Sequence, residues 1–84
     1  MYDILLESQA ERDLKRLPPQ LFRRIAESIK VLAHEPRPPG CRKLAGSGKD
    51  YRVRVGDYRI LYEILDGPRE VRIYRVRHRR EVYR

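Results

Sequence analysis

The sequence predicts a two-layer α+β fold, with an N-terminal helical hairpin on one face of an antiparallel four-stranded sheet, in the order β-α-α-β-β-β. Two observations support this prediction. Between residues 8 and 35 the apolar residues recur at helical spacing, and from residue 51 onward they alternate with charged residues at a period of two. The chain shows no internal repeat and no domain boundary, so we expect residues 1–84 to form one domain.

The first half of the chain is expected to form one strand and two helices. The apolar run at residues 2–6 predicts the strand, and the capping-box sequence SQAE at 8–11 predicts the start of a helix that ends before Pro18. A second helix extends to Pro36, and its apolar stripe contains Leu21, Ile25, Ile29 and Leu32. The tight Pro-Pro connection indicates that the two helices are antiparallel.

The second half is expected to form a loop and a three-stranded meander. Residues 36–50 are rich in proline and glycine and have no period, which indicates a loop. Three strands follow, YRVRV at 51–55, YRILYEIL at 58–65 and VRIYRV at 71–76. Gly56 and Asp57 have the composition of a two-residue hairpin turn. In the last strand Arg75 falls on the same face as Ile73, so we expect a bulge or bend there.

One face of this sheet is expected to carry a cluster of arginines. Because side chains alternate along a strand, Arg52, Arg54 and Arg59 project from the same face of two neighbouring strands, opposite the helices. The next strand ends at His78 and Arg79, which we expect to join this face. A merely solvated outer face is the alternative interpretation.

The positive charge of the chain is concentrated in its second half. The net charge is +8, and residues 1–40 hold 7 Lys/Arg against 6 Asp/Glu, whereas residues 41–84 hold 13 against 6. Of the 20 basic residues, 16 are arginine, whose planar fork suits bidentate contact with phosphate and stacking on bases. This composition favours a surface that binds a polyanion, and an arginine-rich surface without a ligand is the alternative.

Several classes of protein are excluded. Cys41, His34 and His78 are the only cysteine and histidines, so they form neither a disulfide nor a credible zinc site, and no acidic cluster is present to hold Mg²⁺. The GSGK sequence at 46–49 lacks the spacing of a phosphate-binding loop. We therefore expect no cofactor. No apolar run approaches the roughly 18 residues of a membrane span, and the N-terminus does not resemble a signal peptide, so we expect a cytoplasmic protein without membrane contact.

The residue types that are present permit metal-free cleavage of RNA. RNA carries its own nucleophile, the 2′-OH, so an enzyme need only align it, stabilise the charge that develops around phosphorus and protonate the leaving 5′-oxygen. Arginines can stabilise the charge, and a histidine can transfer a proton near neutral pH. A tyrosine can stack on a base.

The whole chain resembles the RelE branch of the RelE/ParE toxin superfamily. The resemblance rests on the element order together with KLxG at 43–46, YRVRVGDYRILYEI at 51–64 and HRREVY at 78–83. It implies the toxin of a type II toxin–antitoxin pair, which enters the ribosomal A site and cuts the mRNA there to leave a 2′,3′-cyclic phosphate and a 5′-OH. It also implies a small RelB-like antitoxin as inhibitor, with operator DNA bound only through the antitoxin complex.

The resemblance assigns roles to four arginines. Arg52 and Arg54 match two basic residues that are commonly lysines in the family, and Arg59 matches the arginine of its Tyr-Arg-x-x-Tyr strand. Arg79 matches the arginine that stabilises the phosphate or the leaving group. Relatives that use a glutamate base have it roughly where this chain has Arg42 or Lys43.

The closing segment supplies the remaining roles. Tyr83 matches a tyrosine that stacks on the substrate base, although simple packing of Tyr83 on the sheet is the alternative. His78 matches a histidine that some members use as acid or base. Because a guanidinium stays protonated, Arg52 and Arg54 are poor bases, and His78 is the better candidate for proton transfer. Further contacts to RNA and the ribosome are assigned to the basic residues Lys43, Lys49, Arg77 and Arg80.

Two other functions are possible on the same fold. A ParE-like inhibitor of DNA gyrase is one, but such members generally lack the His-Arg…Tyr set found here. A non-catalytic nucleic-acid-binding autorepressor is the other, and it predicts binding that weakens steeply with salt and no cleavage.

Overall fold

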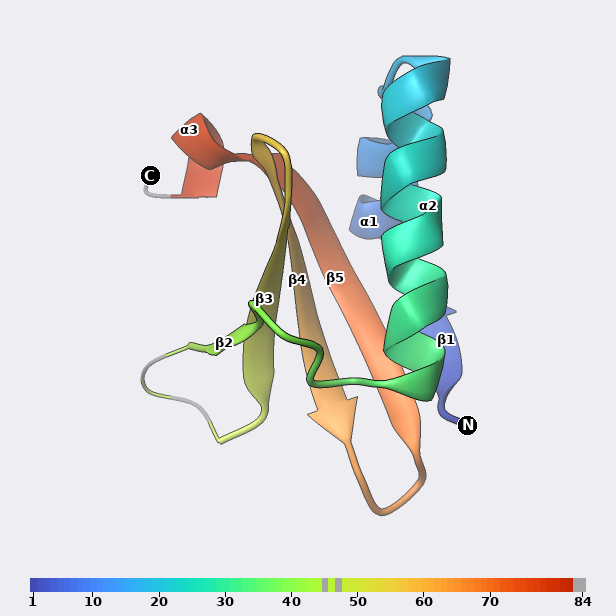
Figure 1. Cartoon of the computed structure of the whole chain (residues 1–84), viewed down its shortest axis with the longest axis vertical. Helices are drawn as coiled ribbons and strands as arrows, with labels where there is room; N and C mark the ends of the chain where they lie inside the picture. The colour runs from blue at the N-terminus through green and yellow to red at the C-terminus, as the bar shows by residue number, and fades with distance from the viewer. Residues whose placement is uncertain (45, 47, 83–84) are drawn as a thin grey trace.

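The fold is a single sheet with two helices on one side (Figure 1). The computed structural model describes residues 1–44, 46 and 48–82, and within them five strands are ordered β1-β5-β4-β3-β2. The elements in chain order are β1 (Asp3–Leu6), α1 (Ser8–Lys15), α2 (Pro19–His34), β2 (Arg42–Lys43), β3 (Asp50–Val55), β4 (Tyr58–Leu65), β5 (Glu70–His78) and α3 (Arg79–Val82). The predicted α+β class and the helices on one face are confirmed.

The sheet differs from the prediction in strand number and direction. β1 pairs in parallel with β5, with Asp3 opposite Glu70, so the sheet is mixed and not purely antiparallel. The predicted loop contains the short strand β2, which places Arg42 opposite Arg52. Neither pairing has a local sequence signal, because β2 is too short to show a period and the direction of β1 depends on a partner at the far end of the chain.

The helices begin and end close to their predicted positions. α1 starts at Ser8, but the predicted capping box is wrong: Glu7 is the N-cap, and no side chain caps the helix. The backbone N–H of Glu11 instead donates to the carbonyl of Glu7 at 3.0 Å. α2 has Pro19 in its first turn, where a missing N–H costs nothing, and ends before Pro36.

The core lies between the helices and the inner face of the sheet. The two helices contribute Ala10, Leu14, Ile25 and Leu32, and the sheet contributes Tyr51, Val55, Ile60, Tyr62, Ile64, Val71, Ile73 and Val76. In β4 the buried apolar residues alternate as the period-two pattern predicts, so the side chains between them face the side of the sheet away from the helices. None of the helices in the described part of the chain is long and apolar enough to span a membrane.

A turn and a bulge set the register of the outer face. Val55 lies opposite Tyr58, so Gly56 and Asp57 form a two-residue turn between β3 and β4. Gly56 adopts φ 60°, the positive value that such a turn requires at its first central residue. The expected irregularity in β5 is confirmed, because Leu61 lies opposite Arg75 while Tyr62 lies opposite Ile73. The extra residue in β5 reverses which face each following residue occupies.

Candidate nucleic-acid interface

Three arginines lie side by side across the three central strands. Arg54 of β3 is opposite Arg59 of β4, and Arg59 is opposite Arg77 of β5. Directly opposite residues share a face, so these three side chains form one row, which we call the arginine row. Arg52 and Arg42 are opposite each other in β3 and β2, and the alternation of β3 places them on the same face. The row and this pair together are the arginine face.

The arginine face is buried in part. Arg59 is only 6 % exposed, and its Nη1 donates to the carbonyl of Tyr58 at 3.3 Å. Arg52 Nη1 and Arg77 Nε are buried from solvent with no hydrogen-bond partner. A buried donor without an acceptor costs about 1–3 kcal/mol, and like charges that face each other across strands are destabilising. Arg77 Nη2 lies 3.4 Å from Glu81 Oε2, and an anion placed over the row would offset the remaining repulsion among these charges in the same way.

The opposite end of the same face is acidic. Asp50 of β3 lies opposite Glu63 of β4, and with Glu7 and Tyr74 they line a cavity of about 350 Å³. Burial, followed by the neighbouring Asp50 carboxylate, raises the pKa of Tyr74 to about 12. Lys49 Nζ lies 3.4 Å from Glu63 Oε2. A polyanion is therefore attracted to the arginine row and repelled from the far end of the sheet.

His78 is on the other side of the sheet from the arginine row. The bulge exchanges the faces of the last residues of β5, so Arg77 lies opposite Arg59 and His78 lies opposite Tyr58. The His78 and Tyr58 rings are packed edge to face with their centroids 5.3 Å apart, and Tyr58 packs against the core. The expectation that His78 joins the arginines on their face is wrong for this reason, and Arg77 takes the place expected for it.

Arg79 and Arg80 lie in α3, next to the β3–β4 turn. The backbone N–H of Arg79 donates to the carbonyl of Asp57 at 2.7 Å, and Arg79 Nε lies 4.0 Å from Asp57 Oδ1. The N–H of Arg80 donates to His78 Nδ1 at 3.2 Å, and the neutral ring then carries its proton on Nε2. Figure 1 shows α3 at the same end of the molecule as this turn, so α3 lies near the end of the sheet that carries the arginine row. Tyr83 lies outside the described residues.

The two lysines assigned to RNA contacts do not join the arginine row. Lys43 lies opposite Tyr51, a core residue, so the register directs its side chain toward the helix side of the sheet. Lys49 is at the acidic end. The residue that the sequence did not single out is Arg42, which joins the arginine face only because β2 pairs with β3.

The described residues offer no cluster of side chains that would bind a metal ion. In the part of the chain that the structure describes, no group of three or more His, Cys, Asp or Glu side chains is placed to hold a metal ion. What the arginine face can do by itself is bind an anion and stabilise negative charge as it develops, because its donors are fixed by the strands that carry them.

Comparison with known proteins identifies the family. Residues 4–83 match the family model described as the ParE toxin of the type II toxin–antitoxin system, parDE. The toxin RelG of Mycobacterium tuberculosis is 38 % identical over 87 residues, which cover 99 % of this chain and 97 % of that protein.

Solved structures agree with this match. The archaeal RelE–RelB complex from Pyrococcus horikoshii superposes with a TM-score of 0.83 and 31 % identity, over 93 % of this chain and 94 % of that one. The toxin–antitoxin complex RelBE2 from Mycobacterium tuberculosis superposes with a TM-score of 0.81 and 33 % identity, over 92 % and 96 %. The chain therefore belongs to the RelE/ParE superfamily and is a RelE-type toxin of a type II toxin–antitoxin system.

Proposed function

We propose that this toxin is a ribosome-dependent mRNA endonuclease that cuts mRNA in the ribosomal A site and so inhibits translation. The observation that carries the proposal is the arginine row, in which Arg54, Arg59 and Arg77 lie directly across three strands. A row of guanidinium groups on rigid strands is suited to a phosphodiester whose charge increases in the transition state. The acidic far end of the sheet limits the substrate to one end of the face.

The proposed reaction uses the 2′-OH of the RNA as nucleophile and no metal ion. The 2′-oxygen attacks the adjacent phosphorus, the bond to the 5′-oxygen breaks, and the products are a 2′,3′-cyclic phosphate and a 5′-OH. Arg59 and its neighbours in the row stabilise the equatorial oxygens during this step. Arg52 adds a further positive charge, and Arg79 stabilises the leaving group from the end of the row.

Proton transfer is proposed for His78, and base stacking for Tyr83. The role of His78 has less direct support than the role of the arginines, because His78 lies beside Tyr58 on the helix side of the sheet and not on the arginine face. A histidine in that position reaches the reacting phosphate only around the end of β5. The ribosome contacts are proposed for the remaining basic residues Lys43, Lys49 and Arg80.

We further propose that an acidic, RelB-like antitoxin holds the toxin inactive in the cytoplasm and carries it to operator DNA. Two of the similar structures are toxin–antitoxin complexes: the RelE–RelB complex from Pyrococcus horikoshii and the RelBE2 complex from Mycobacterium tuberculosis. A net charge of +8 that is concentrated on one half of the chain favours a partner of opposite charge.

The test is to map mRNA 5′ ends on translating ribosomes, with and without the toxin. We expect new 5′ ends in codon register that are absent from the same RNA without ribosomes. Arg59→Ala serves as the inactive control, and Arg23→Ala on the exposed side of α2 serves as the matched control for loss of one arginine. Cuts outside the codon register, or equal cutting of naked RNA, would exclude the proposal.

A ParE-like gyrase inhibitor is the second candidate, since the matching family model is described as ParE. A DNA supercoiling assay with purified gyrase separates the two. Inhibition of supercoiling together with intact mRNA on ribosomes would favour the second candidate.

A further inference from the structure

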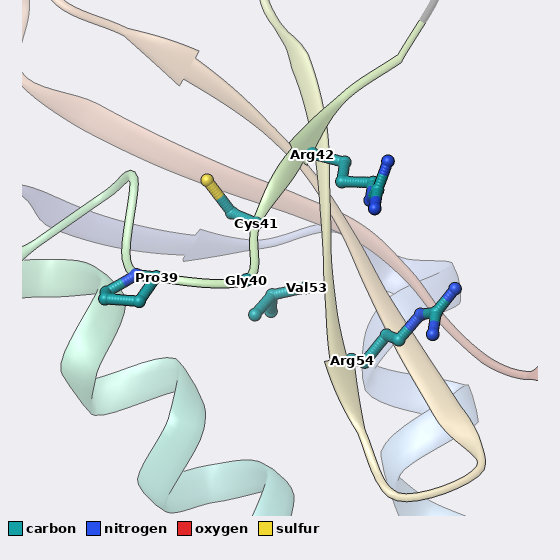
Figure 2. A pocket seen from close by; sticks show the side chains of 6 residues that line it. All are labelled: Pro39, Gly40, Cys41, Arg42, Val53 and Arg54. Atoms are coloured by element: carbon teal, nitrogen blue, oxygen red, sulfur yellow. The ribbon is translucent and has the colours of Figure 1, made fainter.

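A cleft opens at the edge of the sheet, beside the end of the arginine row. It has a volume of about 540 Å³ and is lined by Pro39, Gly40, Cys41, Arg42, Val53 and Arg54. Figure 2 shows that it lies where the segment before β2 separates from β3, with Val53 pointing across it toward Gly40. The guanidinium groups of Arg42 and Arg54 extend to one side of the cleft.

The cleft exists because β2 is too short to cover the edge of β3. Pairing of the two strands ends with Arg42 opposite Arg52. The N–H of Leu44 donates to the carbonyl of Asp50 at 2.7 Å, so the main-chain groups of Asp50 face β2. Alternation along β3 then directs the main-chain N–H and C=O of Arg54 to the same edge, beyond the last residue of β2. One donor and one acceptor therefore face the cleft.

The side chains around these two groups suit an aromatic, polar ring. Val53, which is half-buried against the core, and Pro39 provide apolar surface on the helix side. Arg42 and Arg54 provide guanidinium planes, which stack on nucleobases. Arg54 is also the end member of the arginine row, so a phosphate held by the row lies next to the cleft.

We propose that this cleft is a nucleobase subsite, which receives the base of the nucleotide whose phosphate lies on Arg54 and Arg59. An RNA strand that runs along the row from Arg77 to Arg54 crosses three strands, about 10 Å, and leaves the sheet at the cleft. There the base stacks between Val53 and the arginine planes, and its edge bonds to the main chain of Arg54. The inference rests on the proposed phosphate-binding role of the arginine face.

The geometry favours a base over a peptide strand. Addition of a strand to a sheet edge needs several consecutive main-chain pairs, whereas only Arg54 offers its N–H and C=O between the end of β2 and the turn at Gly56. A base needs one donor and one acceptor side by side, which a single residue supplies. The cavity also has the volume of a small-molecule site.

The test is an NMR titration of the free toxin with two ligands that differ only in the base. Adenosine 5′-monophosphate and ribose 5-phosphate carry the same phosphate and sugar. We expect adenosine monophosphate to bind about tenfold more tightly, as base stacking contributes, and to shift the Arg54 amide and the Val53 methyl resonances. Ribose 5-phosphate should shift the resonances of the arginine face, including those of Arg54, and should leave the Val53 methyl resonances unchanged.

Two variants sharpen the comparison. Val53→Phe fills the cleft, and we expect it to lower the affinity for adenosine monophosphate to that for ribose 5-phosphate without changing the latter. Val31→Phe makes the same substitution at an exposed position of α2 and should change neither affinity. Should Val53→Phe fail to fold, the comparison of the two ligands in the unmodified chain decides the question.

Equal affinities for the two ligands, or an Arg54 amide that responds to a short acidic peptide and not to adenosine monophosphate, would overturn the inference. The outcome is separable from that of the proposed function. Base-dependent binding without mRNA cleavage on ribosomes would remove the endonuclease and keep the subsite, and cleavage without base-dependent binding would do the reverse.

Discussion

Asp13 of α1 and Arg75 of β5, which are 62 positions apart in the chain, form a bidentate ion pair. Arg75 Nε donates to Asp13 Oδ2 at 2.9 Å, and Arg75 Nη2 donates to Asp13 Oδ1 at 3.3 Å. The same Oδ2 accepts the backbone N–H of Val76 at 2.9 Å. Asp13 thus fixes the bulged part of β5 from the helix above it and takes Arg75 out of the outer face. The bulge in turn places Arg77 beside Arg59.

Removal of the Asp13 carboxylate should destabilise the fold. Asp13 is 7 % exposed, and Asp13→Ala leaves Arg75 and the Val76 N–H without their acceptor. We expect a loss of about 3–5 kcal/mol in the free energy of unfolding, measured by urea denaturation. Glu27→Ala, which breaks the exposed pair with Lys30 at 3.4 Å, is the matched control and should cost less than about 1 kcal/mol. Similar losses in both variants would contradict this role.

Arg59 should be the most sensitive position of the arginine face for cleavage. It is the central and most buried member of the row, so its donors are the most firmly oriented. Arg59→Ala is expected to lower the single-turnover cleavage rate on ribosomes by about 10²–10³-fold. Arg59→Lys keeps the charge but loses the planar fork, and should recover only part of the rate. A variant that cleaves at the full rate would exclude Arg59 from the site.

His78→Gln tests proton transfer separately from charge stabilisation. If His78 transfers the proton, the variant should lose about 10²-fold or more in rate while binding to ribosomes is unchanged, because glutamine retains hydrogen bonding but cannot titrate. The measurement is single-turnover cleavage with a parallel ribosome co-sedimentation assay. Full activity would show that the proton is transferred by another group, in accord with the position of His78 on the Tyr58 side of the sheet.

The salt dependence of RNA binding should report each phosphate contact. Arg54→Ala removes one exposed cation from the row, so the slope of log K against log salt should become shallower by about 0.7 for single-stranded RNA. Fluorescence anisotropy with a short RNA between low and physiological salt measures this slope. Arg12 is an exposed arginine on α1, and Arg12→Ala should leave the slope unchanged. An equal change in both variants would indicate binding by net charge alone.

Asp66 should make stability dependent on pH in the acid range. Hydrogen bonds from Arg37, at 2.9 Å, and from the Tyr2 hydroxyl, at 2.6 Å, lower the pKa of Asp66. Because the folded-state pKa lies below the unfolded value of about 3.9, this stabilisation is present above that pH and is lost as the pH falls through the folded-state pKa.

Asp66→Asn should therefore flatten the pH dependence of the unfolding free energy in this range, measured by urea denaturation at a series of pH values. Tyr2→Phe removes the hydroxyl donor and keeps the bonds from Arg37, so it should have an intermediate effect. An unchanged pH profile in Asp66→Asn would show that other carboxylates account for the acid sensitivity.

The periodicity of the sequence was sufficient to predict every described strand except β2, the helical hairpin and the common face of Arg52, Arg54 and Arg59. These features depend on local periodicity and on the need to bury one face of each element. The family could also be recognised from the sequence, because each of its motifs is an unbroken stretch of residues. The capping box was a local signal that misled, because Glu7 is the N-cap at the junction with β1.

The tertiary structure decided which residues complete the site. The sequence indicated an irregularity near Arg75, but not whether Arg77 or His78 would then face the arginines. That outcome depends on Asp13, which lies on another element and bonds to both Arg75 and the main chain of the bulge. The position of Arg42 and the cleft beside Arg54 likewise depend on where β2 stops pairing with β3. Such features are set by non-local pairing, and a shift of one residue in register changes the face of every side chain that follows.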